Sequence, residues 1–352
     1  MQKPSTLKRL NKKWLLIGGL ASILLLLTTT IAISLGAVHI PFLDVIKILL
    51  QEGLKLPLDI EVDQTNINII MKIRLPRVIL AGLIGATLAL AGAAFQGLLR
   101  NPLADPFTLG ISSGASVGAV AVIFLQITIP YIGGFTLPII SIIFSSMTLF
   151  AVLLFARLVE PTMKVETIIL TGIISSSFLG AFLSLMIALS GEELRQIIGW
   201  LLGSVSMRGW EYIQLLLPFF VIGSILLLLN IRELNALSFG EERANYIGVN
   251  VKKRKYMILI AGSLLTGAAV AVSGTIGFVG LVIPHIIRLI TGPNHMYVLP
   301  FSMIFGATFL IVADLIARTI IQPAELPVGV ITALVGAPIF ALILVGRRRR
   351  NV

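Results

Sequence analysis

Long runs of apolar residues alternate along the chain with short segments that carry most of its charges. About 20 consecutive apolar residues suffice for a helix to cross the hydrocarbon core of a bilayer. The pattern predicts an all-α integral membrane protein with ten transmembrane helices, at 14–35, 75–99, 108–128, 135–157, 165–189, 212–231, 256–273, 277–290, 299–320 and 326–346. Two further short helices, at 41–50 and within 191–209, are predicted not to span. No hydrophilic segment is long enough to fold alone, so residues 1–352 form one transmembrane domain.

Composition supports this class of protein. Hydrophobic residues make up 57% of the 352 residues and charged residues only 12%, whereas a soluble domain carries about 25% charged residues. The chain has no cysteine. Disulfides, thiolate metal sites and thiol redox chemistry are therefore excluded.

The net charge of +11 is concentrated at the two ends of the chain and in the loop 231–256. Ten helices place the basic segments 1–13 and 347–352 on the same side of the membrane. With both termini cytoplasmic, 19 of the 27 lysines and arginines lie inside and 8 outside, as the positive-inside rule requires. The charge therefore indicates membrane orientation, and no nucleic-acid partner is expected.

Small residues form two stripes at helical spacing between residues 74 and 118. The first contains Gly82, Gly85, Ala89, Gly92 and Ala93, and the second contains Gly110, Gly114 and Gly118. In a bilayer, small residues allow helix backbones to approach closely, so this stretch is predicted to be the packed centre of the bundle. Six of its residues recur 182 positions later, which suggests an inverted repeat of the kind found in transporters.

Arg74-Leu-Pro-Arg77 is predicted to lie at the external face, where basic residues are disfavoured. One interpretation is that these arginines bind lipid phosphates. The other is that they form a docking site for an acidic partner, because complementary charges steer encounter and fix register. Arg318 is expected near the same surface.

The longest internal loop, 231–256, is predicted to contain a short helix at 239–247. Ser238 and Glu241 have the spacing of a capping box, and Gly248 is placed to end the helix. The basic run 252–255 is interpreted as a membrane anchor. The loop is either an ordinary connector or a surface that fits a partner's groove.

Few polar side chains fall within the predicted spans. Asp314 is the only carboxylate deep in one, and an i,i+4 ion pair with Arg318 is favoured over a role in ion transport. Gln96, Ser112, Ser113 and Ser116 either line a pathway or bond between helices, and His285 is expected to be structural. The sequence contains no metal-ligand cluster, nucleophile–base constellation or phosphate-binding loop ending in Lys-Ser/Thr.

Several segments together resemble the FecCD family, the membrane subunits of ABC importers for iron–siderophores, haem and vitamin B12. They are RLPR (74–77), AGAAFQGLLRNPLADPFTLGISSGASVG (91–118), LSFGEERANYIGV (237–249), GFVGLVIPHIIR (277–288) and ELPVGVITALVGAPIF (325–340). They occur in the family's order and cover nearly the whole chain from Arg74 onward.

The resemblance implies a multi-pass protein of a prokaryotic cell membrane that works with a second permease subunit. The pair is either a homodimer or a heterodimer, and the homodimer is favoured because the subunit is single and unfused. It also implies two cytoplasmic ATPase subunits, which bind the ATP-Mg, and an external substrate-binding protein. No cofactor is expected on this chain, and 101–106 would be a cytoplasmic turn.

The resemblance also assigns roles to residues. Arg74, Arg77 and Arg318 would dock the binding protein. The ATPase-coupling helix would comprise Ser238, Phe239, Gly240, Glu241, Glu242, Arg243, Ala244, Tyr246, Ile247, Gly248 and Val249. Residues expected to line the pathway or pack helices are Gln96, Gly110, Ser113, Gly114 and Gly118.

The expected function is that of a permease subunit, not an enzyme, in an ATP-driven importer working by alternating access. Its substrate would be a bulky metal chelate, with an iron–siderophore favoured over vitamin B12 and haem. The alternative is a secondary transporter driven by an ion gradient. An intramembrane enzyme is disfavoured because the chain lacks the required groups.

Overall fold

The computed structural model describes residues 12–36, 38, 40–53, 55–56 and 63–350. The basic residues before position 12, the loop carboxylates Asp59 and Glu61, and residues 351–352 of the tail lie outside the described residues.

Every regular element in the described part of the chain is helical. The elements are α1 (Lys12–Ser34), α2 (Phe42–Ile48), η1 (Leu49–Gly53), α3 (Gln64–Asn68), η2 (Ile69–Arg74), α4 (Leu75–Leu98), η3 (Pro106–Leu109), α5 (Ile111–Phe124), η4 (Gly133–Phe135), α6 (Thr136–Val159), α7 (Val165–Leu189), α8 (Leu194–Leu201), α9 (Trp210–Leu229), α10 (Ile231–Leu237), α11 (Glu241–Tyr246), α12 (Val251–Ser273), α13 (Val279–Thr291), α14 (His295–Thr319) and α15 (Val328–Arg350).

Each of the ten predicted spans overlaps one of these helices. By length and composition, seven apolar helices of the described chain can cross a membrane, and three shorter apolar helices are α5, α13 and 328–343 of α15. The short helices α2 and α8 lie where non-spanning helices are predicted.

Several predicted boundaries were wrong. The helical run that contains α4 begins at Gln64 instead of 75, and α12 begins at Val251 instead of 256. Both helices begin after an N-cap residue. The Asp63 side chain accepts a hydrogen bond from the amide of Thr65, and the Asn250 side chain accepts one from the amide of Lys253. The run 252–255 therefore belongs to the first turns of α12.

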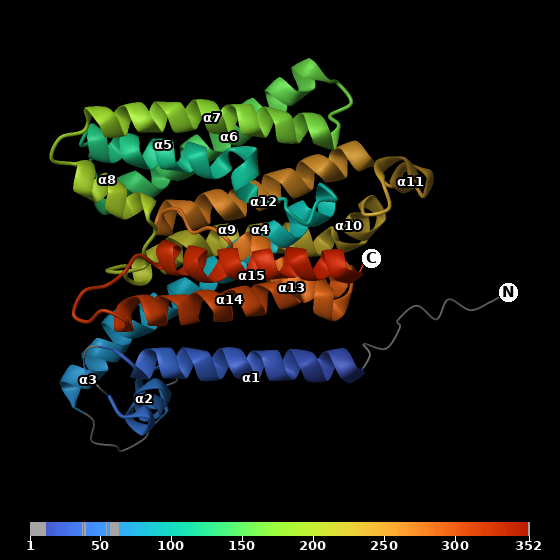
Figure 1. Ribbon diagram of the computed structural model, residues 1–352. Coiled ribbons are helices and arrows are strands. Elements are labelled where there is room, and N and C mark those ends of the chain that lie inside the picture. Colours follow the sequence, from blue (N-terminus) through green and yellow to red (C-terminus); the bar gives the residue numbers. More distant parts are fainter. Residues whose placement is uncertain (1–11, 37, 39, 54, 57–62, 351–352) are drawn as a thin grey trace.

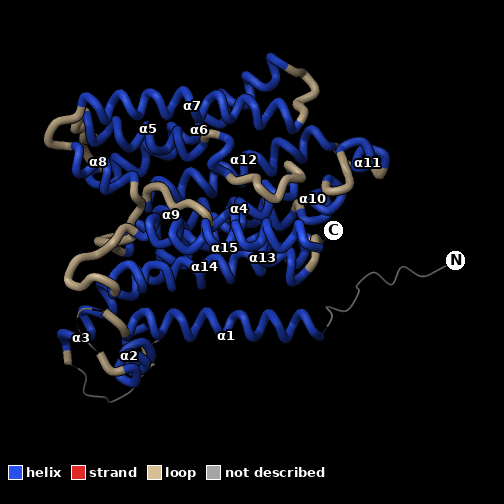
Figure 2. The backbone as a smooth tube through the Cα atoms, in the orientation of Figure 1, coloured by secondary structure: helices blue, strands red, loops and turns tan. Residues whose placement is uncertain are grey.

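The helices form one layered bundle with α4 and α12 at its centre (Figures 1 and 2). Within the most apolar 18 residues of each helix, 89% of the residues are buried in the run 64–98 and 78% in α12, against 17% in α1. Helix α4 packs against α14, α12, α13 and α9, and α12 packs against α9, α6 and α5. The first small-residue stripe, in α4, therefore lies at the centre, as predicted, whereas the second lies beside it along α5.

Two glycines of α4 lie against the backbone of other helices. A Cβ at Gly85 would be 2.2 Å from the carbonyl oxygen of Gly306 in α14, and one at Gly92 would be 2.0 Å from that of Gly280 in α13. Such distances leave no room for a methyl group. The glycines therefore set the separation of α4 from both neighbours.

The second stripe joins α5 to α6 and α7. A Cβ at Gly114 would lie 2.1 Å from the hydroxyl oxygen of Thr148, and one at Gly118 would lie 2.9 Å from Cβ of Phe144. Gly110 precedes α5 with φ 78°, a left-handed conformation that favours glycine. Ser113, one residue before Gly114, is half-buried.

The bundle has two distinct ends (Figure 1). Helices α3 and α8, the start of α4 and the loop 320–327 lie at one, here called the Arg77 end. Helices α10 and α11 lie at the other, here called the α11 end, together with the first described turn of α1 and the last turns of α15. Both described chain ends therefore lie on the same side of the bundle.

Replacement of Gly85 by alanine should destabilise the fold by about 1–3 kcal/mol, because the methyl group meets backbone that cannot rotate away. The matched control is Gly19→Ala in α1, where nothing lies within 4 Å of the new Cβ. Thermal unfolding in detergent should show a lower midpoint for Gly85→Ala alone. Equal midpoints for the two variants would contradict this packing.

Candidate functional site

Arg77 lies at the centre of an ion network at the Arg77 end. Its Nε donates to both carboxylate oxygens of Asp314 at 3.1 Å, and its Nη2 donates to Oδ1 at 2.9 Å. Its Nη1 donates to Glu325 at 2.8 Å. These ion pairs join α4, α14 and the loop after α14. The three residues, together with Arg74 and Arg318, are here called the Arg77 network.

The predicted ion pair between Asp314 and Arg318 is present, at 3.7 Å, but Arg77 is the closer partner of Asp314. Asp314 is 1% exposed. A buried carboxylate is stable as an ion only when cations and hydrogen bonds compensate its lost hydration. Two guanidinium groups therefore hold Asp314.

Arg74 and Arg318 are buried, with exposed fractions of 5% and 7%. Arg74 Nη1 donates to the carbonyls of Ile33 at 2.9 Å and Ser34 at 2.7 Å, and its Nη2 donates to that of Val38. Arg318 donates to the carbonyl of Ala32. The last carbonyls of a helix lack intrahelical partners and carry partial negative charge, so the two arginines cap α1.

Glu325 completes the network at the surface and was missed as an individual site residue. It also accepts a hydrogen bond from the Ser206 hydroxyl at 2.7 Å. Burial raises the pKa of Glu325, but hydrogen bonds from Arg77 and Ser206 outweigh it and hold that pKa below its ordinary value. Glu325 lies 248 residues from Arg77, and no local spacing links the two.

Gln96 connects α4 to α13. Its amide nitrogen donates to the carbonyls of Gly280 at 3.2 Å and Leu281 at 3.0 Å, and its oxygen accepts from Arg288. Of the two roles predicted for Gln96, the structure shows the bond between helices. Gln96 and Arg288 also line a cavity of about 870 Å³ towards the α11 end, together with Arg100, Ser238, His285 and His295.

Helix α11 projects at the α11 end (Figure 1). Phe239, Tyr246 and Ile247 are 70%, 89% and 71% exposed, as expected of a surface that fits a partner. Ala244, predicted on the same surface, is fully buried against the bundle. An exposed group of large apolar side chains outside the long apolar helices is typical of a protein–protein contact.

The predicted capping box was wrong. Ser238 donates to the carbonyl of Asn235 in the preceding turn, and α11 begins only at Glu241, with Gly240 at its N-cap. The carboxylate of Glu241 instead accepts hydrogen bonds from the ammonium group of Lys255. The predicted end was right: the amides of Gly248 and Val249 bond to the carbonyls of Asn245 and Ala244, in the Schellman arrangement.

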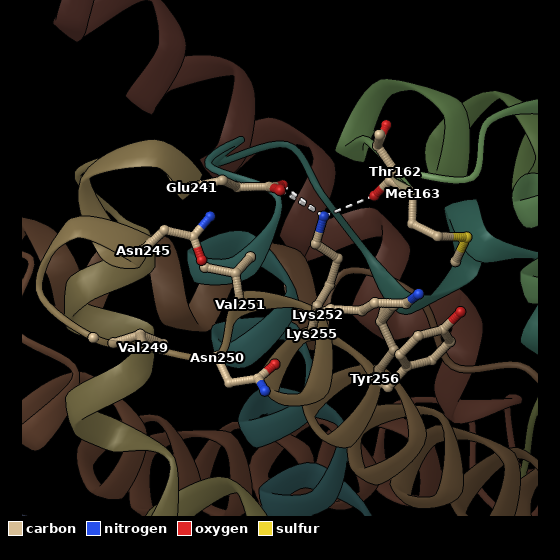
Figure 3. A pocket seen from close by; sticks show the side chains of 12 residues that line it. Thr162, Met163, Glu241, Asn245, Val249, Asn250, Val251, Lys252, Lys255 and Tyr256 are labelled. Atoms are coloured by element: carbon tan, nitrogen blue, oxygen red, sulfur yellow. Dashed lines mark hydrogen bonds and ion pairs between the residues drawn. The ribbon is translucent and has the colours of Figure 1, made fainter.

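A cavity of about 550 Å³ lies between α11, the start of α12 and the α6–α7 turn (Figure 3). Its wall includes Thr162 and Met163 of that turn, Asn245 of α11, and Lys252 and Tyr256 of α12. Lys255 reaches across it to Glu241 and to the Met163 carbonyl (Figure 3). Among the described residues, no group of three or more His, Cys, Asp or Glu side chains is placed to bind a metal ion.

Removal of the Asp314 charge should destabilise the protein by about 3–5 kcal/mol, because Asp314→Asn leaves the buried Arg318 without a carboxylate partner and leaves Arg77 with Glu325 alone. The control is Asp44→Asn, which breaks the exposed pair with Lys47 at a cost of about 0–1 kcal/mol. Thermal unfolding of both variants measures the difference. Similar midpoints would mean that the Arg77 network contributes little to stability.

Comparison with known proteins identifies relatives whose sequences match nearly the whole chain. The profile of the FecCD transport family matches residues 24–346. An uncharacterised ABC transporter permease of Bacillus subtilis is 60% identical over 319 residues, covering 91% of this chain and 90% of the relative. The cobalamin import permease of Halobacterium salinarum is 41% identical, covering 84% and 78%.

A solved structure has the same fold. It is an ABC transporter assigned to the metal-chelate type, in an inward-facing conformation. The two chains superpose with a TM-score of 0.81 and 33% identity, and the match covers 94% of this chain and 99% of the other.

Proposed function

The chain belongs to the FecCD transport family, and from that premise we propose that it is the permease subunit of an ATP-driven importer for a bulky metal chelate. The main observation behind the proposal is that 94% of the chain matches an ABC transporter assigned to the metal-chelate type, in an inward-facing conformation. Cobalamin, which the 41% identical relative imports, is itself a metal chelate. An iron–siderophore and haem are the other candidate substrates.

The proposed topology has ten transmembrane helices and both termini in the cytoplasm. The location of both described chain ends at the α11 end supports an even number of spans. The excess of lysine and arginine predicted for that side supports its cytoplasmic assignment. The Arg77 end would then face outward.

An inverted repeat within the chain is also part of the proposal. Helices α4, α5 and α6 have 24, 14 and 24 residues, and α12, α13 and α14 have 23, 13 and 25. In each set the buried first helix packs against the third helix of the other set, because α4 contacts α14 and α12 contacts α6. This reciprocal packing supports a twofold symmetry between the two sets of three helices, of the kind known in transporters.

ATP would be bound by two partner ATPase subunits, since the sequence has no phosphate-binding loop of its own. We assign the segment 238–249 to the contact with them, because Phe239, Tyr246 and Ile247 are exposed at the end proposed to be cytoplasmic. A second permease subunit, an identical copy in our proposal, would complete the pathway. Closure of the ATPases would rock the two subunits between outward-open and inward-open states.

The docking site for a substrate-binding protein is proposed at the Arg77 network. Arg77 would contact the partner, because its Nη1 faces the partly exposed Glu325 while its other nitrogens hold Asp314. Arg74 and Arg318 would support this surface by fixing the end of α1. The partner would supply carboxylates, which bind guanidinium groups with matching geometry.

An ion-gradient mechanism is the weaker alternative. It requires a group in the membrane that gains and loses a proton or an ion during transport. Among the described residues, Asp314 is the only carboxylate deep in a proposed span, and it forms ion pairs with both Arg77 and Arg318.

Deletion of the gene should abolish uptake of one substrate from a panel of labelled cobalamin, haem and several iron–siderophores. Depletion of ATP should stop that uptake in wild-type cells, whereas a protonophore added at constant ATP should not. Reintroduction of the intact gene controls for secondary effects. Uptake that stops with the protonophore and continues without ATP would refute the proposal.

Glu325→Gln should strengthen binding of the substrate-binding protein by about two- to fivefold, because Arg77 loses a competing carboxylate at the surface. Added salt should weaken binding to both wild type and variant. The control is Glu192→Gln, which removes an exposed carboxylate of the α7–α8 turn. Equal affinities for wild type and Glu325→Gln would mean that Arg77 does not take part in docking.

A further inference from the structure

The ammonium group of Lys255 connects three elements at the α11 end. We propose that Lys255 is a positioning residue: with Glu241 and the Met163 carbonyl it forms a clamp that makes α11, α12 and the α6–α7 turn move as one body. In this role it transmits displacement of α11 to the centre of the bundle. The coupling role rests on the proposed function, whereas the clamp itself does not.

Three hydrogen-bond acceptors surround the ammonium group, one for each of its protons. Lys255 Nζ lies 2.7 Å and 2.8 Å from the two carboxylate oxygens of Glu241 and 2.7 Å from the carbonyl oxygen of Met163. The Lys255 side chain is 4% exposed. A charge buried to this degree is strongly destabilising without partners, so the ammonium group holds both neighbours in place.

Helix α11 needs such a restraint because it has only six residues. Its C-terminal end is joined to α12 through the turn at Gly248 and the cap at Asn250. Its N-terminal end follows Gly240, whose φ of 111° is accessible mainly to glycine. Glu241 is the first residue of α11, so the ion pair joins the N-terminal end of α11 to α12.

The same turn of α12 also holds α10. Arg254 pairs with Glu233 at 3.1 Å and donates to the side-chain oxygen of Asn230 at 3.0 Å. Adjacent residues of α12 therefore fasten both short helices of the loop. Lys252 and Lys253, in the same basic run, are exposed and fit the expected role of membrane anchors.

The clamp leads directly into the core. Helix α12 is one of the two central helices and packs against α4, α6 and α9. Met163 itself is 2% exposed and lies between α6 and α7 with a left-handed φ of 56°. A force on α11 that is transmitted through Lys255 would thus reach α12 and both helices joined by the turn.

The clamp can be tested without ATP or substrate. The chain has no cysteine, so spin labels at Tyr246→Cys in α11 and Arg157→Cys in α6 report one distance. In nanodiscs, Lys255→Met should at least double the width of that distance distribution, and Lys252→Met should leave it unchanged. If Lys255→Met fails to fold, the same measurement is made on Glu241→Gln, which changes only the half-exposed partner of Lys255. An unchanged width in the Lys255 or Glu241 variant would refute the clamp.

The coupling role is tested in the complete transporter, purified with its ATPase subunits and reconstituted with the binding protein. Lys255→Met should retain ATP hydrolysis within about twofold but import at least fivefold less substrate per ATP hydrolysed. The double variant Lys255→Met with Glu241→Gln should be no worse than Lys255→Met alone, because the pair acts as a unit.

Two outcomes would overturn the coupling role, and only the second would also refute the proposed function. A broadened distance with unchanged import per ATP would make the clamp merely structural. Absence of ATP-driven import in the wild-type complex would refute the proposed function and the coupling role with it, while the distance measurement would still decide whether the clamp exists.

Discussion

The structure depends on close backbone contact between α4 and its neighbours. Gly85 and Gly92 leave no room for a Cβ against the carbonyls of Gly306 and Gly280. In a bilayer, hiding apolar surface from water does not drive helices together, so contact distance and interhelical hydrogen bonds must supply the stability. These contacts fix the distance from α4 to α14 and to α13. The other helices pack around α4 and α12.

Charged groups are confined mainly to the two ends of this core, where they join elements far apart in sequence. At one end Arg77 holds Asp314 and Glu325, and at the other Lys255 holds Glu241. Both clusters connect a central helix, α4 or α12, to a segment that a partner protein would touch. In the proposed importer, the binding protein would therefore contact one end of the bundle and the ATPases the other. The central helices would connect these two ends.

The sequence predicted the helices well because apolar length is a strong signal in membrane proteins. It predicted burial of both glycine stripes and the pairing of Asp314 with Arg318. It failed where tertiary contacts override local pattern: Arg74 caps α1, and Glu241 leaves its expected cap for Lys255. Glu325 had no signal of its own, because its partner Arg77 is remote in the chain.

The central claim is that α11 faces the cytoplasm and meets an ATPase there. The cysteine-free chain permits a direct measurement with Tyr246→Cys, which places one thiol on a side chain that is 89% exposed in the wild type. A maleimide that cannot cross membranes should label inverted vesicles but not intact cells, and co-expression of the ATPase subunits should protect the thiol. Labelling of intact cells would place α11 outside and contradict the account.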